Sequence, residues 1–335
     1  ELSQKVRELE AQVYTWRPVT QFVVSSATLR PKGSKQLALR TLAGFEPSTV
    51  QIYSRNIIDS YQDGLDLVNI LERLGDEGAL ILVSRDFGRA KVKEIVDELN
   101  ERGFRAIQAV SGRKFMDKFS SGEVGYLVGS ASYYGVAVRG LDEPKRLKYV
   151  IFYGVPKTKL PLEDSLNNPF TALRVADALS LDVGNLRKKV LLLSPSEIQA
   201  IKFALRNSET LNGKLEELRK SLSSLKENVI EVLKSKKPSV LKLDNFTVER
   251  EGRRYFILIP DAITYIQGSG RASRILHNGF TLGLSVILVD KPELFEILVK
   301  RVKGLSNDTE FKKFNDLDLD SIKKEVMESR NGGSN

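Results

Sequence analysis

Apolar and polar positions between residues 79 and 154 follow a regular order of short apolar runs and longer amphipathic stretches. Apolar runs of this length predict buried strands, namely Ala79–Val83, Phe104–Val110, Gly125–Gly129 and Tyr149–Gly154. Apolar residues spaced by three and four predict intervening helices at Arg89–Arg102 and Lys114–Phe119. The order returns with a strand at Leu284–Asp290 and a helix at Pro292–Val302. Such alternation predicts an α/β fold whose parallel sheet is covered by helices on both faces.

The first part of the chain carries weaker signals of the same kind. We expect an amphipathic helix at Leu2–Val13, a buried strand at Val19–Ser25, a short helix at Leu37–Leu42, the start of a strand at Thr49–Tyr53, and a helix at Leu65–Leu74 closed by Gly75. The chain starts inside a helical pattern without Met and finishes in the linker-like Asn331–Asn335. We therefore expect a piece of a larger protein.

The alternation is interrupted from residue 157 to about residue 245, where the pattern is mainly helical. We expect one helix at Phe170–Leu179 and another that runs from a capping box at Ser194–Glu197 to Leu205. A heptad stripe follows, made of Leu211, Leu215, Leu218, Leu222, Leu225, Val229 and Val232. This stripe favours a helical hairpin core within the chain over a coiled coil between chains. A β-hairpin is expected from Phe246–Val248 and Tyr255–Leu258.

Two arginines stand out after this insertion, in the stretch Gln267–Arg274. We expect a helix at Gln267–Leu276, which would place Arg271 and Arg274 on one face. Gly268 and Gly270 would mark the helix start and let the backbone approach a ligand. A pair of guanidiniums beside free N–H groups can receive phosphate oxygens. The alternative is a solvated arginine pair on an ordinary helix.

Strand ends supply a second group of candidate residues. Because ligands of parallel sheets lie at the carboxyl ends of the strands, Ser84-Arg85, Ser111–Arg113 and Ser130–Tyr134 should share one rim.

Composition limits the chemistry and points to a polyanionic partner. The chain has no cysteine and one histidine, His277, which argues against disulfides, cysteine-ligated zinc and any histidine-rich metal site. Lys and Arg number 52 against 43 Asp and Glu, so the formal net charge is +9. Neither a bilayer-spanning apolar run nor a signal-peptide pattern occurs, so we expect a soluble cytoplasmic protein. The high charged fraction also suits a thermophile.

The strand-end sequences, taken in order, resemble the second RecA-like domain of superfamily 2 helicases. Their counterparts of the family motifs are Ser26-Ala27-Thr28, Leu80–Arg85, Phe119-x-x-Gly122 with Tyr126–Gly129, Arg139-Gly140-Leu141-Asp142 and Gln267–Arg274. Within that superfamily, three stretches are similar to reverse gyrases, namely Ser130–Gly135 before Val138–Gly140, Tyr149–Lys157 and Tyr265–Arg274. Reverse gyrases carry an insertion called the latch between the last two, where the helical insertion lies here.

The resemblance implies a domain plan. Residues 1–48 would end the first RecA-like domain, 49–156 and 249–303 would form the second, 157–248 would be the latch, and 304–335 would lead toward a topoisomerase domain. The sequence has no G-x-x-x-x-G-K-[ST] and no D-E-x-D-like box after a buried strand. ATP and Mg²⁺ would therefore be bound mainly by the first helicase domain, and the isolated chain should not hydrolyse ATP.

The resemblance also implies residue roles. Arg271 and Arg274 would act as arginine fingers, Gln267 would orient phosphate or water, and Gly140, Asp142 and Gly270 would adjoin the nucleotide. For Asp142, a capping or turn role is the alternative. DNA backbone would lie against Ser84, Arg85, Gly112, Arg113, Ser132, Tyr133 and Tyr134. Tyr133 and Tyr134 would either stack on bases or pack beneath the rim.

The parent would then be a monomeric ATP-dependent type IA topoisomerase that introduces positive supercoils into DNA. Two other hypotheses remain open. One is an ordinary superfamily 2 DNA or RNA helicase with a helical insert, and the other is a non-enzymatic interaction module on a degenerate RecA scaffold.

Overall fold

The computed structural model describes residues 2–15, 55–110, 114–132, 135–139, 141–276, 279–306 and 309–331. The chain divides into two compact units, Glu1–Ser54 and Arg55–Asn335. In the first unit, the expected amphipathic helix is confirmed as α1 (Leu2–Thr15), and its Val6 and Leu9 are exposed. The predictions for Val19–Ser25, Ser26-Ala27-Thr28, Leu37–Leu42 and Thr49–Tyr53 lie outside the described residues.

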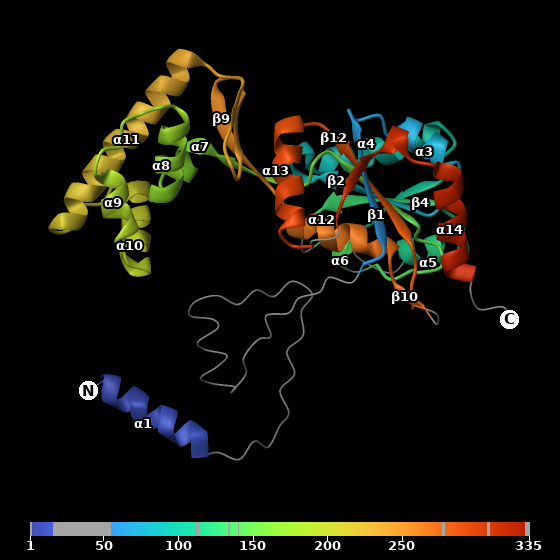
Figure 1. The fold of residues 1–335 in the computed structure, drawn as a ribbon, viewed down its shortest axis with the longest axis horizontal. Helices are drawn as coiled ribbons and strands as arrows, with labels where there is room; N and C mark the ends of the chain where they lie inside the picture. Colours follow the sequence, from blue (N-terminus) through green and yellow to red (C-terminus); the bar gives the residue numbers. More distant parts are fainter. Residues whose placement is uncertain are drawn as a thin grey trace. The chain divides into compact units, whose positions relative to one another are not determined.

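The second unit is built on a seven-stranded parallel sheet (Figure 1). Its strands are β1 (Ile57–Asp63), β2 (Ala79–Ser84), β3 (Ala106–Gln108), β4 (Tyr126–Ala131), β5 (Tyr149–Tyr153), β12 (Gly283–Val289) and β13 (Phe311–Lys313). The strand order is β13-β1-β12-β5-β2-β4-β3, and every neighbouring pair is parallel. The expected α/β class is therefore confirmed.

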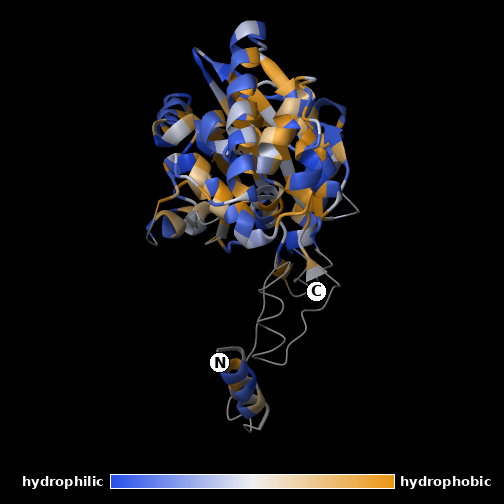
Figure 2. Cartoon of the chain, turned by 90° about the vertical axis from the view of Figure 1, so that its left-hand side faces the viewer, coloured by the Kyte–Doolittle hydropathy of each residue, from blue (hydrophilic) through white to orange (hydrophobic). Residues whose placement is uncertain are grey.

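Helices cover both faces of this sheet, as Figure 1 shows. On one face, α3 (Leu67–Leu74), α4 (Gly88–Glu101) and α14 (Leu319–Asn331) share a buried apolar cluster with alternate strand residues such as Ile81. The other face carries α6 (Val136–Arg139), α12 (Ala262–Ser269) and α13 (Pro292–Lys303), and α5 (Lys114–Ser121) contacts β4. Figure 2 shows helices that carry hydrophilic residues beside hydrophobic ones, as expected where one face of a helix is buried. Burial on both faces explains why the core strands read as unbroken apolar runs.

The end of the chain contributes more to the core than the sequence predicted. Residues 304–335 were expected only to lead toward a topoisomerase domain. Instead β13 extends the sheet beside β1, a 3₁₀ turn places Phe314 at 0% exposure, and α14 buries Ile322 and Val326. The segment is therefore part of the α/β unit.

The insertion between β5 and α12 has its own core. It contains β6 (Lys157–Pro161), α7 (Leu162–Ser165), α8 (Pro169–Ala178), α9 (Leu186–Leu191), α10 (Pro195–Asn207), α11 (Lys214–Lys236), β7 (Val240–Lys242), β8 (Thr247–Glu251) and β9 (Arg254–Pro260). Its four strands form an antiparallel sheet in the order β6-β9-β8-β7, which includes the expected hairpin. The capping box of Ser194 and Glu197 is present. The α11 stripe packs on α8 within the chain, so the expected helical core is confirmed, with Leu233 rather than Val232 fully buried at its end.

The two ends of the insertion lie side by side. Lys157, the first residue of β6, pairs with Pro260, the last residue of β9. The Asp261 N–H then donates to the Pro156 carbonyl at 2.8 Å, and Arg301 of α13 donates to the Pro260 carbonyl at 3.0 Å. These contacts favour insertion limits at residues 157 and 260, whereas the limit expected after residue 248 falls within β8.

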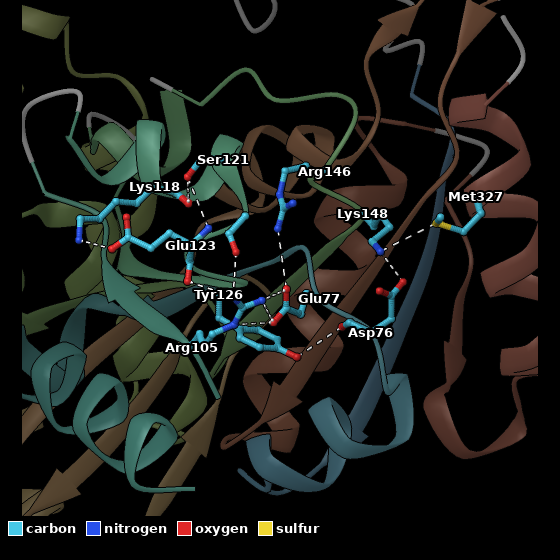
Figure 3. A network of polar contacts seen from close by, with 11 residues as sticks. Asp76, Glu77, Arg105, Lys118, Ser121, Glu123, Tyr126, Arg146, Lys148 and Met327 are labelled. Atoms are coloured by element: carbon cyan, nitrogen blue, oxygen red, sulfur yellow. Dashed lines mark hydrogen bonds and ion pairs between the residues drawn. The ribbon is translucent and has the colours of Figure 1, made fainter. Parts of the chain in front are cut away.

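Charged side chains gather where β2 and β4 begin (Figure 3). Arg105 holds Glu77 through Nε and Nη2, with Nη2 at 2.7 Å from both carboxylate oxygens. Lys148, which immediately precedes β5, is paired with Asp76. Arg105 is about half exposed, so its ion pair with Glu77 contributes little to stability and mainly orients the connections at the amino ends of the strands.

Candidate functional site

The stretch that carries the two arginines is not one helix, contrary to the sequence prediction. The helix α12 ends at Ser269, Gly270–Ala272 form a single 3₁₀ turn, and Ser273 is extended. The Arg274 N–H donates to the Thr281 hydroxyl at 3.0 Å, and the Thr281 N–H donates to the Arg274 carbonyl at 2.8 Å. These bonds draw Arg274 into the hairpin of β10 (Ile275–Leu276) and β11 (Gly279–Phe280). We call residues 270–274 the arginine loop.

The glycines of this stretch do not mark a helix start, contrary to the sequence prediction. Gly268 lies inside α12, where a Cβ would come within 2.7 Å of Leu82 Cδ1 and 2.8 Å of Phe152 Cζ. Gly268 thus allows α12 to pack closely on β2 and β5. Gly270 has φ of −60°, and nothing lies within 4 Å of a Cβ built there.

Replacing Gly268 by alanine is therefore expected to lower the free energy of unfolding by about 1–3 kcal/mol, because the added methyl overpacks the face of the sheet. Chemical denaturation of the chain measures the effect. Gly270→Ala is the matched control and should change stability by less than about 0.5 kcal/mol. Equal effects in the two variants would contradict the packing role.

The arginine loop meets the segment 141–148 at one backbone carbonyl. Arg271 Nη1 donates to the Leu141 carbonyl at 2.9 Å, and Arg274 Nη2 approaches the same oxygen at 3.4 Å. Arg274 Nε also lies 3.2 Å from Asp142 Oδ1. Two sequence motifs 130 residues apart, the R-G-L-D stretch and the arginine stretch, are thereby brought together.

The electrostatics of this cluster favour an anion. Burial lowers the pKa of the Arg274 guanidinium, and the neighbouring Asp142 carboxylate opposes that shift. The Asp142 side chain is 79% exposed and the Arg274 side chain 26% exposed. Among the described residues, the only carboxylate partner of Arg274 is the well-solvated Asp142. The partly dehydrated Arg274 guanidinium can therefore exchange Asp142 for phosphate oxygens.

The other residues expected at this site are only partly described. Gln267 lies half-buried in the last turn of α12, next to the arginine loop. Gly140 lies outside the described residues. The 141–148 segment leads into β5 and the arginine loop leads through its hairpin into β12, so the cluster adjoins the amino ends of these strands.

The predicted DNA rim lies at the opposite, carboxyl ends of the strands. Ser84 of β2 is paired in register with Ala131 of β4, so Ser84-Arg85 and Ser132 do lie on one rim. Arg85 is exposed and Ser132 is half-buried. Ser84 is 1% exposed and donates its hydroxyl to the Val155 carbonyl at 3.0 Å, so its side chain is occupied inside the fold, contrary to a surface contact. Gly112, Arg113, Tyr133 and Tyr134 lie outside the described residues.

A buried network that the sequence did not reveal holds α12 in place. Arg55 donates to Asp59 at 2.8 Å and to the Ser269 hydroxyl at 2.7 Å, and the Tyr265 hydroxyl donates to Asp59 at 2.6 Å. Burial raises the pKa of Asp59, and Arg55 opposes the shift. In the sequence, this network is indicated by Asp59, which follows the two apolar residues at the start of β1. Arg55 thus ties β1 to the residue just before the arginine loop.

The described ranges contain neither a metal-binding cluster nor a membrane-spanning helix. None of these residues form a group of three or more His, Cys, Asp or Glu that could hold a metal ion. No helix in the same part of the chain is long and apolar enough to cross a membrane.

The fold and the site together define an α/β domain, built on a parallel sheet, that carries an inserted subdomain. No protein-family model matches the chain. The chain is 55% identical over all of its length to Reverse gyrase 2 of Sulfolobus acidocaldarius, of which it covers 29%. It is 49% identical over 98% of its length to Reverse gyrase 1 of Sulfurisphaera tokodaii, covering 28% of that protein. Reverse gyrase of Methanocaldococcus jannaschii is 33% identical over 92% of the chain, which covers 16% of it.

The resemblance to the reverse gyrases is thus confirmed over the whole chain, which corresponds to one segment of these longer proteins. The chain spans less than a third of the length of these relatives. Among solved structures, S. cerevisiae Dbp5 bound to RNA and ADP BeF3 aligns with a TM-score of 0.43 and 14% identity, over 88% of this chain and 51% of that one.

Proposed function

We propose that this chain is the second helicase-like part of an ATP-dependent DNA topoisomerase that introduces positive supercoils. The observation that carries the proposal is the convergence of Arg271, Arg274 and Asp142 at one carbonyl in a chain similar throughout to reverse gyrases. Two guanidiniums on one loop can bind the γ-phosphate of an ATP molecule that is held by a neighbouring domain.

In this proposal Arg271 and Arg274 stabilise negative charge that develops on phosphate oxygens during hydrolysis. Asp142 holds Arg274 until the phosphate is in place, and Gln267 orients phosphate or water. Gly140 and Gly270 would adjoin the nucleotide. ATP and Mg²⁺ would be held mainly by the first RecA-like domain of the same parent chain, which supplies the phosphate loop and the metal-binding acid. The isolated chain would then not hydrolyse ATP.

The carboxyl ends of β2 and β4 are the proposed path of the DNA backbone. Exposed Arg85 and half-buried Ser132 support this placement, and Gly112, Arg113, Tyr133 and Tyr134 belong to the same proposal. Phosphate contacts of this kind position DNA without reading its sequence. The insertion, 157–260, would pass domain movement to the topoisomerase domain of a monomeric parent.

Incubating the intact parent protein with closed circular DNA and ATP tests this function. We expect the linking number to rise above that of relaxed DNA, with no rise when ATP is replaced by ADP. Strand separation without any change in linking number would overturn the proposal and favour the alternative, an ordinary superfamily 2 helicase with a helical insert.

A further inference from the structure

We infer that Arg330, in the last turn of α14, is a positioning residue that holds the arginine loop and the 141–148 segment in their catalytic arrangement. The inference rests on the proposed function, since it assigns to Arg330 a role in the reaction of Arg271 and Arg274. It concerns a part of the chain in which the sequence indicated no site residue.

One guanidinium joins the two segments of the site. Arg330 Nη2 donates to the Ala272 carbonyl and to the Leu147 carbonyl, each at 2.9 Å. Its Nη1 donates to the Leu282 carbonyl at 2.6 Å and to the Val326 carbonyl within α14 at 2.8 Å. Ala272 stands between the two arginines, and Leu147 belongs to the segment that presents Leu141 and Asp142.

The contacts of Arg330 are partly buried. Burial lowers the pKa of Arg330 to about 10, which still leaves the guanidinium charged at neutral pH. A Cβ added to Gly283 would lie 2.5 Å from the Ala272 Cβ and 2.7 Å from the Ala272 carbonyl oxygen, the oxygen that accepts from Arg330. Gly283 and Arg330 thus both pack closely against Ala272, and loss of Arg330 would remove one of these two contacts.

The docking of α14 does not depend on Arg330 alone. Ile322 and Val326 are buried in the core, and Lys323 Nζ donates to the Arg73 carbonyl at 3.0 Å. Met327 Sδ lies 3.9 Å from Lys148 Nζ, a contact visible in Figure 3. Removal of the Arg330 guanidinium should therefore loosen the two segments of the site while the helix stays in place.

The test compares Arg330→Met with Lys323→Met in the intact parent protein. Both substitutions remove a cation that bonds a backbone carbonyl from α14, but only Arg330 touches the arginine loop. We expect Arg330→Met to lower kcat for ATP hydrolysis by about 10²-fold, as for a displaced catalytic group, with KM for ATP within about twofold. Lys323→Met should leave kcat within about twofold of the parent.

Amide hydrogen exchange supplies a readout besides activity. The amides of 270–274 and 141–148 should exchange faster in Arg330→Met, while those of α12 and β5 should not. Arg330→Lys keeps the positive charge but has one donor nitrogen in place of three, so it should give intermediate values of kcat and of amide exchange. This variant replaces Arg330→Met if the methionine variant does not fold. Unchanged kcat in the Arg330 variant, or equal falls in both methionine variants, would overturn the inference. If Arg274→Ala is also fully active, the arginine-finger proposal fails; if Arg274→Ala is inactive, only the role of Arg330 fails.

Discussion

Arg274→Ala in the intact parent protein is expected to lower ATP hydrolysis by about 10³-fold or more, the range found when an arginine finger is removed. The physical reason is that the Arg274 side chain is partly dehydrated, at 26% exposure, and that hydrogen bonding to Thr281 fixes its backbone in the arginine loop. A charge in such a place stabilises developing negative charge more strongly than a solvated arginine could. DNA binding should persist, because the proposed DNA rim lies at the opposite ends of the strands.

Steady-state phosphate release, measured with and without DNA, gives the result. Arg274→Lys should rescue little, because an ammonium cannot reproduce the two-pronged geometry of a guanidinium. Asp142→Asn is the matched control, since it weakens the 3.2 Å ion pair yet leaves the guanidinium in place. We expect that control to lose less than about tenfold. Wild-type hydrolysis in Arg274→Ala would rule out the arginine-finger role.

The sheet could be predicted from sequence because burial on both faces leaves a local mark. The strands β2, β5 and β12 are almost wholly apolar, and their expected bounds agree with the structure to within a residue or so. The strand β1 was missed because Asp59 and Ser60 interrupt its apolar run. Both are buried, and Asp59 is compensated by Arg55 and Tyr265. The latter contact joins residues 206 positions apart, which no local pattern records.

The arrangement of the site escaped prediction for a similar reason. Helical spacing placed Arg271 and Arg274 on one helix face, yet hydrogen bonds with Thr281 turn the chain at Arg274. Both residues nevertheless converge on the Leu141 carbonyl. The order of the motifs along the chain indicated that the R-G-L-D stretch and the arginine stretch belong to one site. The geometry of their contact is determined by tertiary hydrogen bonds, which the sequence does not reveal. The contribution of Arg330 depends wholly on such contacts, because its partners Leu147, Ala272 and Leu282 are distant in sequence.

A buried lysine at the start of the insertion has two carboxylate partners from the α/β unit. The Lys157 side chain is 0% exposed, and its Nζ lies 2.5 Å from Asp290 Oδ2 and 3.2 Å from Asp86 Oδ1. Asp290 directly follows β12, and its other oxygen accepts from the Val155 N–H at 2.8 Å. Asp86 follows β2 beside Arg85. One ammonium thus links the first residue of β6 to the ends of two core strands.

Lys157→Met is expected to lower the free energy of unfolding by about 3–5 kcal/mol, because methionine fills the space of the lysine stem but leaves two buried carboxylates without their cation. Chemical denaturation of this chain measures the loss. Lys159→Met, two residues along the same strand, removes an ion pair between Lys159, 25% exposed, and Glu251, 48% exposed, and should cost at most about 1 kcal/mol. Adding Asp290→Asn to Lys157→Met should recover part of the loss, since one unpaired charge is then gone. If Lys157→Met and Lys159→Met are equally stable, Lys157 does not link the insertion to the core. If only Lys157→Met loses stability and Asp290→Asn restores part of it, the link depends on charge rather than on packing.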